Sequence, residues 1–279
     1  MQIDHRISET AFLVNEWRAQ LVELSQDLYA HLWTTPSTRQ LTDEFEATVN
    51  PHDGINCALR NRYFLDRIRA FVEAHPSAVF VNVAAGFTSY PFLIAPCCES
   101  IEIDYPHVMD WKRTKIREWQ RAGVLPSPAL EFIGADLNQE ADRQRLTEML
   151  QVRLRGRPSF ILFEGITYYL EMPILRHWFE ICRAVQEPGS VLAQNSWMAG
   201  SETHPKFLRL EKFFRERLGL GNQRYNLFDG ISLRNVPGYE LAELTTIAAQ
   251  ERVYCTTNIL EDPNAIIPLE LALLRRVTE

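Results

Sequence analysis

The sequence is short of cysteine, of glycine and of long hydrophobic runs, and each scarcity excludes a class of protein. Its five cysteines, an odd number without C-x-x-C spacing, argue against a disulfide framework or a zinc site and favour reduced thiols in the cytoplasm. The scattered histidines suggest no metal site. No stretch approaches the roughly 20 apolar residues of a membrane-spanning helix. The opening "MQIDHRISET" is followed by no apolar signal-peptide region.

Basic residues are outnumbered too, since 29 Lys and Arg stand against 36 Asp and Glu, for a net charge of −7 and a pI near 5.6. The basic clusters are short, as in Arg153 to Arg157. We therefore expect neither a nucleic acid nor a membrane as a partner. What is present is an ordinary globular composition, 46% hydrophobic and 23% charged over 279 residues, which suffices for a sizeable core.

Short apolar runs alternate with amphipathic segments through the middle of the chain. The runs predict strands at 78–83, 100–104, 130–136, 159–165 and 190–196. The amphipathic segments predict helices near 88–96, 106–122, 139–152 and 172–186. Strands that are apolar throughout and separated by helices favour a parallel sheet covered on both faces. The sequence therefore predicts a doubly wound α/β fold.

The two ends of the chain show other patterns. Apolar residues at helical spacing predict one helix over 10–34, followed by a polar loop with breakers and a second helix over 57–74. After residue 200, a basic helix near 204–218 precedes two late strands, "YELAELTTI" and "IIPLELALLRRV", which could form an antiparallel edge of the same sheet. We expect residues 1–54 to be a helical extension that serves as a lid, and residues 55–279 to be the α/β domain.

The stretch "FVNVAAGFTSYPF" leads from an apolar strand through a turn with a single glycine, Gly86, toward a helix. In a doubly wound sheet, ligands bind at the carboxyl ends of the strands. Asp104 ends the next strand, eighteen residues after Gly86, close to the spacing at which an acidic residue receives ribose hydroxyls. The alternative is structural: Asp104 could simply cap the helix that begins near Pro106.

A single glycine argues against a dinucleotide in this turn. A pyrophosphate needs several unobstructed backbone amides at a helix N-terminus, which is why NAD sites repeat glycine. S-adenosylmethionine has no phosphate and needs only one close backbone approach and a ribose acceptor. We therefore favour S-adenosylmethionine over NAD as the cofactor, and a methyltransferase over an NAD-dependent dehydrogenase.

Three more residues extend this hypothesis. Asp136 ends the third strand, where the adenine amino group could find an acceptor, and Glu164 ends the fourth, where an acid could face the methionine ammonium or the sulfonium. Each could instead cap the next helix. Arg60 shares a helical face with Phe64, Arg67 and Phe71. Its guanidinium could meet the carboxylate of the cofactor, with Arg67 as a second candidate.

Five segments together resemble one family. The stretches "ALRNRYFLD", "VNVAAGFTSYPF", "EIDYPHVMDWKRTKI", "IGADL" and "FEGITYYL" are similar, in order and spacing, to the leucine carboxyl methyltransferase family of S-adenosylmethionine-dependent O-methyltransferases. The resemblance covers roughly residues 57 to 195. It implies a Rossmann-like class I methyltransferase fold with a mostly parallel seven-stranded sheet, helices on both faces and an N-terminal helical extension.

The resemblance also implies roles for single residues. Arg60 would bind the cofactor carboxylate, and Gly86, in a turn shared with Ala84, would pack against the methionine part. Asp104 would take the ribose hydroxyls. The adenine would contact Asp136 and Leu137, and the methionine end would contact Glu164. The sequence departs from the family turn N-L-G-A-G-F-D-T-R at three positions: Ala84 replaces its first glycine, Thr88 its aspartate and Tyr90 its arginine.

The expected reaction moves a methyl group to an oxygen, which mainly requires two aligned reactants and exclusion of water, so no catalytic residue is assigned. A carboxylic acid, with a pKa of about 4, is already a nucleophile at neutral pH, whereas a phenol near 10 needs a general base. The ends of strands four and five offer no histidine or lysine for that role, although His204 lies just beyond. We therefore expect a small-molecule carboxylic acid as substrate.

Residues expected to position the acceptor come from the N-terminal helix, the ends of strands four and five, and the loop 221–238. They are Tyr29, Trp33, Tyr168, Tyr169, Asn195, Trp197, Arg224 and Arg234. Aromatic residues at helical spacing often pack in a core instead. Two other functions remain open: a hydroxyl O-methyltransferase, and a catalytically inactive protein that binds S-adenosylmethionine for regulation.

Overall fold

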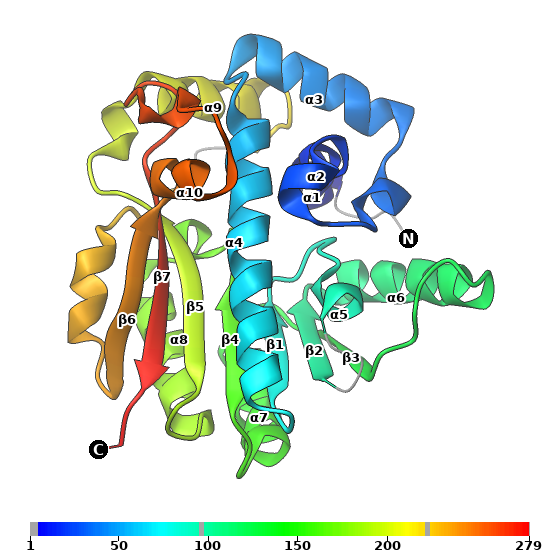
Figure 1. The fold of residues 1–279 in the computed structure, drawn as a ribbon, viewed down its shortest axis with the longest axis vertical. Coiled ribbons are helices and arrows are strands. Elements are labelled where there is room, and N and C mark those ends of the chain that lie inside the picture. The colour runs from blue at the N-terminus through cyan, green and yellow to red at the C-terminus, as the bar shows by residue number, and fades with distance from the viewer. Residues whose placement is uncertain (1–4, 95–97, 221–223, 279) are drawn as a thin grey trace.

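A seven-stranded sheet forms the centre of the molecule (Figure 1), in a computed structural model that describes residues 5–94, 98–220 and 224–278. The strand order is β3-β2-β1-β4-β5-β7-β6. β1 to β5 are parallel, and β7 runs antiparallel to both β5 and β6. The strands are β1 (Val79–Val83), β2 (Glu99–Asp104), β3 (Leu130–Gly134), β4 (Ser159–Phe163), β5 (Val191–Trp197), β6 (Tyr239–Thr246) and β7 (Leu269–Arg276). The predicted α/β fold and its antiparallel edge are confirmed.

Helices cover both faces of the sheet, which explains why β1 and β4 are buried at every position and apolar at nearly all. α4 (Asp53–Ala74) and α10 (Ile247–Tyr254) lie on one face, with Phe80, Phe160 and Leu271 in their core. α7 (Glu140–Leu154) and α8 (Met172–Val185) lie on the other. The remaining helices of this part are α5 (Tyr90–Leu93), α6 (Pro106–Arg121) and α9 (Pro205–Glu216).

The N-terminal segment differs from its prediction. In place of one helix over 10–34 the structure has α1 (His5–Gln20), α2 (Val22–Ser25) and the 3₁₀ turn η1 (Ala30–Trp33). The helix ends because Gln26 adopts a left-handed conformation, with φ of 56°, and because the Ser25 hydroxyl donates to the carbonyl oxygen of Arg18. The apolar spacing was periodic, but it carried no signal for these backbone breaks.

The predicted polar loop is also partly wrong, because it contains α3 (Pro36–Thr48). Thr35 and Thr38 form a reciprocal capping box at its start, and Pro36 occupies the first helical position. Both features favour a helix start, so the proline of "TTPST" begins a helix and does not mark a loop.

The helices α1 to α3 sit over the carboxyl ends of β1 and β2, beside the upper half of α4 (Figure 1). Trp17 of α1 packs edge-on against Phe45 of α3, which in turn packs against Phe213 of α9. The N-terminal segment thus covers the carboxyl ends of these strands, where ligands of such folds bind. That residues 1–54 act as a lid stays a prediction.

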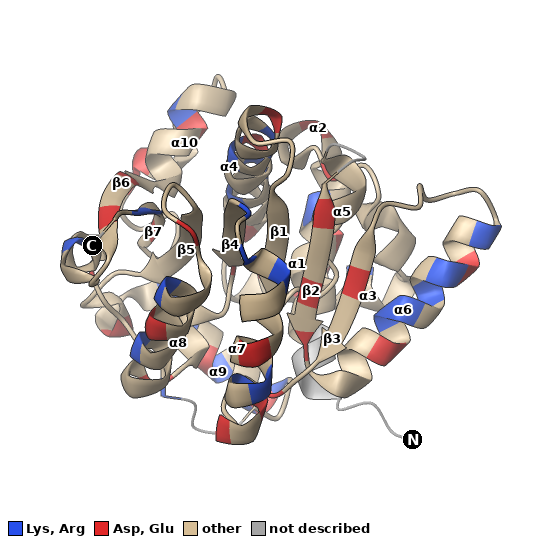
Figure 2. Cartoon of the chain, turned by 90° about the horizontal axis from the view of Figure 1, so that it is seen from below, with Lys and Arg blue, Asp and Glu red and all other residues tan. Residues whose placement is uncertain are grey.

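Charges of both signs are spread over the helices, with Lys and Arg densest along α6, where Asp110 and Glu118 interrupt them (Figure 2). None of the helices in the described ranges is long and apolar enough to cross a bilayer. The exclusion of nucleic acid as a partner stays a prediction.

Candidate functional site

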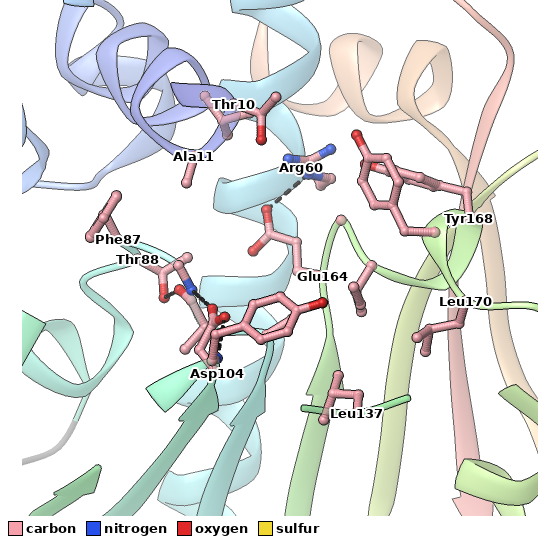
Figure 3. Close-up of a pocket in the computed structure, with 18 of the residues that line it drawn as sticks. Thr10, Ala11, Arg60, Phe87, Thr88, Asp104, Leu137, Glu164, Tyr168 and Leu170 are labelled. Carbon is pink, nitrogen blue, oxygen red and sulfur yellow. Dashed lines mark hydrogen bonds and ion pairs between the residues drawn. The ribbon is translucent and has the colours of Figure 1, made fainter. Parts of the chain in front are cut away.

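A cavity of about 180 Å³ lies at the carboxyl ends of β1 to β4, under α1, and we call it the strand-end cavity (Figure 3). Its walls come from α1, α4, the turn after β1 and the segments after β2, β3 and β4. Six of the seven residues expected to hold the cofactor line it: Arg60, Ala84, Gly86, Asp104, Leu137 and Glu164. The structure therefore brings together residues that are more than a hundred positions apart in the sequence.

The turn after β1 owes its shape to two left-handed residues, Ala84 with φ of 56° and Gly86 with φ of 45°. For alanine this conformation costs roughly 1–2 kcal/mol. Ala84 stands where the resembling family has glycine, a residue that adopts this conformation without strain. Two backbone donors fix the turn: the Gly86 N–H lies 2.8 Å from Oδ2 of Asp104, and the Ala85 N–H lies 3.1 Å from the carbonyl oxygen of Ile103.

Thr88 holds the far side of the turn. Its hydroxyl accepts from Nδ2 of Asn82 at 2.7 Å and donates to the carbonyl oxygen of Ala85 at 2.9 Å. Its own carbonyl oxygen accepts from Nζ of Lys112 at 3.2 Å. Lys112 also forms a 2.7 Å ion pair with Glu102, and both side chains are fully buried. Burial lowers the pKa of Lys112 and raises that of Glu102.

Asp104 presents a carboxylate to the cavity and does not cap α6, whose N-cap residue is Tyr105. Oδ2 accepts from Gly86 and Oδ1 accepts from the Tyr105 N–H at 2.7 Å. Each carboxylate oxygen has two acceptor sites, so one remains on each oxygen for a ligand hydroxyl. Burial raises the pKa of Asp104, and the two backbone hydrogen bonds oppose that rise.

Arg60 and Glu164 meet across the cavity as a buried ion pair, with Nε of Arg60 2.8 Å from Oε1 of Glu164 (Figure 3). The Tyr90 hydroxyl donates to the other oxygen of Glu164 at 2.6 Å. Tyr90 replaces the arginine of the family turn, so this departure supplies a neutral partner for Glu164. A cation beside an anion complements the zwitterionic end of an amino acid. Arg67, by contrast, pairs with Glu243 outside the cavity lining.

Asp136 is the predicted cofactor residue that does not line the cavity. Its Oδ1 accepts from the backbone N–H of Asn138 at 3.0 Å and from its Nδ2 at 3.2 Å. Its neighbours Ala135, Leu137 and Asn138 do line the cavity. Asp136 thus shapes a local turn that presents Leu137 and Asn138. The family resemblance implies a role for Leu137, whereas Asn138 was not predicted.

The roof of the cavity comes from α1, which belongs to the segment predicted as a lid, but none of the lining residues of α1 was predicted from the sequence. Thr10, Val14 and Arg18, at i, i+4 and i+8, lie on one face and line the cavity together with Ala11. A Cβ atom added at Gly86 would lie 3.7 Å from Cβ of Ala11, so the roof contacts the turn closely. Their spacing at i, i+4 and i+8 is the signal that the sequence offered.

A second, smaller cavity of about 70 Å³ adjoins the first, and we call it the aromatic chamber. Five residues line both: Thr10, Val14, Arg60, Tyr168 and Tyr169. Trp197 also lines the chamber, and its ring stacks on that of Tyr168 with 4.0 Å between the centroids. Three of the residues expected to position the acceptor, Tyr168, Tyr169 and Trp197, therefore meet here.

The other five do not line either cavity. Tyr29 packs against Phe92, and Trp33 packs among the rings of Phe87, Trp111 and Trp119, so both belong to an aromatic core. Asn195 is fully buried and accepts the Gly165 N–H at 2.7 Å, which fixes the segment after β4. Arg224 and Arg234 are exposed.

No histidine or lysine lines either cavity within the part of the chain that the structure describes. His204 caps α9: its Nδ1 accepts from the Lys206 N–H at 3.2 Å, and its Nε2 lies 3.0 Å from the carbonyl oxygen of Pro263. The same described ranges hold no group of three His, Cys, Asp or Glu side chains placed to bind a metal ion. The titratable groups that face the two cavities are carboxylates, phenols, arginines and the Cys57 thiol.

Comparisons with known proteins agree with this geometry. The family model described as leucine carboxyl methyltransferase matches residues 10–179, more than half of the chain. A solved structure from Thermobifida fusca, described as a candidate methyltransferase, is 19% identical, with 90% of this chain and 94% of that chain covered and a TM-score of 0.61. A DUF574 family protein from Streptomyces avermitilis is 14% identical, with 90% and 96% covered and a TM-score of 0.62. The two structures show a shared fold. The comparison with curated proteins gives no match.

Proposed function

Because the chain belongs to the leucine carboxyl methyltransferase family and is an S-adenosylmethionine-dependent methyltransferase, we propose that it methylates a carboxylate of a small organic acid. The product would be a methyl ester. The single observation that carries this choice is the lining of the two cavities, in which no described residue is a histidine or lysine. A hydroxyl acceptor would need a general base beside the methyl donor, where both oxygens of Glu164 are already bound by Arg60 and Tyr90, whereas a carboxylate acceptor is ionised at neutral pH.

The cofactor, in this proposal, lies in the strand-end cavity. Its methionine carboxylate meets Arg60 and its ammonium meets Glu164, which are already held side by side. The turn of Ala84 and Gly86 packs against the methionine part. The ribose hydroxyls donate to the free acceptor sites of Asp104, and the adenine lies against Leu137, with Asp136 holding the local turn.

The reaction is an in-line displacement at the methyl carbon. A carboxylate oxygen of the acceptor forms the new C–O bond as the S–C bond breaks. The electron pair of the S–C bond stays on sulfur and gives the neutral thioether of S-adenosylhomocysteine. One negative and one positive charge disappear together, so a dry, apolar surrounding favours the reaction. The protein has to align the two reactants and exclude water, and the position of α1 over the cavity supports that role.

The chemical nature of the product tests this proposal. We expect a panel of small carboxylic acids, incubated with S-adenosylmethionine labelled in the methyl group, to give label in an alkali-labile ester. His204→Ala should leave turnover largely intact, because His204 binds backbone groups of α9 and the Pro263 loop instead of lining a cavity. An alkali-stable methyl ether, or turnover that collapses in His204→Ala, would show that the acceptor is a hydroxyl.

Binding of the cofactor product can be checked without any acceptor. S-adenosylhomocysteine should raise the melting temperature, since a ligand at 100 times its dissociation constant adds about 2.7 kcal/mol to the free energy of unfolding. NAD should not raise it, because its pyrophosphate lacks the glycine amides it needs in this turn. A rise in melting temperature with NAD and none with S-adenosylhomocysteine would contradict the assignment of the strand-end cavity to S-adenosylmethionine.

A further inference from the structure

One face of α4 carries the polar groups of the aromatic chamber. Asp53, Asn56, Cys57 and Arg60 recur at i, i+3, i+4 and i+7, and all four line the chamber. Along the helix axis, Arg60 lies about 6 Å from Asn56 and about 10 Å from Asp53. Arg60 is at the junction with the strand-end cavity, so Asp53 and Asn56 mark the far end of the chamber.

The far end contains an acceptor without a donor. Asn56 is 7% exposed, and its Oδ1 has no hydrogen-bond partner among the described residues. Its amide N–H side faces Asp53, because a hydrogen bond from Asn56 is among the influences that lower the pKa of that carboxyl. Asp53 is 9% exposed and accepts from Nδ2 of Asn50 at 2.8 Å. A buried carbonyl oxygen without a partner is rare in native proteins and indicates a missing donor.

The walls of the chamber are apolar and mostly aromatic. Trp17, Phe45, Trp197 and Phe214 surround the face of α4. Cys57 adds no charge, since burial raises the pKa of its thiol to about 12. The volume of about 70 Å³ has room for about five water molecules at the 10–15 Å³ that each requires. A short, narrow chain fits this space better than a ring system.

We propose that the acceptor of this enzyme carries an amino group at the end remote from its reacting carboxylate, and that Asn56 and Asp53 recognise that group. This inference rests on the proposed carboxyl methylation for the reacting end. The carboxylate would lie at the junction of Arg60, Tyr168 and Tyr169, next to the methyl donor. The chain between the two groups would pass the aromatic walls.

An amino group suits the far end better than a hydroxyl. A hydroxyl donates one proton, whereas an ammonium donates three, and the far end offers a carbonyl oxygen and a carboxylate. A cation is also attracted to the faces of aromatic rings such as those of Trp17 and Trp197. The positive charges of Arg60 and Lys206 help to keep Asp53 ionised against its burial. A second carboxylate at this end would be repelled by Asp53.

Matched linear acids test this inference by binding, independently of turnover. The probes are 6-aminohexanoate, 6-hydroxyhexanoate and heptanoate, which differ only in the terminal group. With the protein saturated in S-adenosylhomocysteine, calorimetric titration should show 6-aminohexanoate binding at least tenfold more tightly than heptanoate, with 6-hydroxyhexanoate between them. Equal affinities, a preference for heptanoate, or no binding of 6-aminohexanoate would overturn the inference.

Variants test whether Asn56 and Asp53 cause the preference for 6-aminohexanoate. Asn56→Leu and Asp53→Asn should each reduce the preference for 6-aminohexanoate at least fivefold, while S-adenosylhomocysteine binds both variants with wild-type affinity and thereby reports that they are folded. Asn264→Leu, at an exposed loop position, should leave the preference unchanged. An unchanged preference in Asn56→Leu would overturn the inference. If 6-aminohexanoate binds as expected but yields no ester, the proposed reaction fails and the recognition site stands.

Discussion

The strand-end cavity and the aromatic chamber differ in how their polar groups are satisfied. In the cavity, Asp104, Arg60 and Glu164 each have close partners, and a buried ion pair of Lys112 and Glu102 supports the turn from behind. In the chamber, aromatic walls surround a carbonyl oxygen that has no partner among the described residues. The comparison teaches that the polar groups of the cavity are held in place before any ligand binds, whereas the chamber leaves one acceptor that the proposed ligand would satisfy.

The largest expected effect concerns the support of the cavity. Lys112→Met should lower the free energy of unfolding by about 3–5 kcal/mol, because it leaves the buried charge of Glu102 without its partner. The matched control is Lys115→Met, whose exposed pair with Glu118 contributes at most about 1 kcal/mol. Urea unfolding measures both. Combining Lys112→Met with Glu102→Leu should recover most of the loss, and equal losses in the two single variants would contradict this account of the turn.

Protonation of Asp53 in the aromatic chamber should make the free energy of unfolding depend on pH. Burial raises the pKa of Asp53 from 3.8 to about 6, so the folded protein holds a proton that the unfolded chain has released between these values. The free energy of unfolding should therefore fall as the pH rises through this window, by about 3 kcal/mol in total from this group. Asp53→Asn should lack that fall. Unfolding curves of both proteins from pH 4 to 7 measure it, and parallel profiles would contradict it.

Arg60 belongs to both regions, so its removal tests the boundary between them. Arg60→Ala should weaken binding of S-adenosylhomocysteine by about 1.5–3 kcal/mol, the value of a lost charge-assisted hydrogen bond. Arg62→Ala should have little effect, because its guanidinium pairs with Asp66 outside both cavities. Calorimetric titration of each variant measures the change. Similar losses in both would show that Arg60 has no special contact with the cofactor.

The smallest expected effect lies in the turn of the cavity. Ala84→Gly should raise the free energy of unfolding by at most about 1 kcal/mol, since relief of the left-handed strain slightly exceeds the entropy cost of glycine. Ala85→Gly, next to it and without a positive φ, should instead lower the free energy by about 0.5–1 kcal/mol. Thermal unfolding compares them, and a loss of stability in Ala84→Gly would contradict the strain.

The sequence predicted the sheet well because buried parallel strands leave continuous apolar runs that differ from everything around them. The carboxyl ends of parallel strands lie along the same side of a sheet, which allowed the sequence to place Gly86, Asp104 and Glu164 near one another. Their partners could not be predicted. Nothing in the order of residues says that Tyr90 donates to Glu164 or that Asp136 turns toward Asn138.

The N-terminal segment was predicted less well. Its apolar periodicity is real, but backbone breaks at Gln26 and a capping box at Thr35 divide it into separate helices. Tyr29 and Trp33 follow the break at Gln26, and their rings pack in a core and line neither cavity. The chamber itself depends on contacts between α1, α4 and α9, which are tertiary and leave no local pattern.

Arg60, Tyr168 and Tyr169 form a wall that the two cavities share, and a shared wall has a thermodynamic consequence. Whatever factor the cofactor adds to the affinity for the acceptor, the acceptor must add the same factor to the affinity for the cofactor. In the proposed reaction, conversion of the sulfonium into a thioether removes a positive charge beside this wall. The coupling between the two cavities is then expected to differ between the pair of reactants and the pair of products.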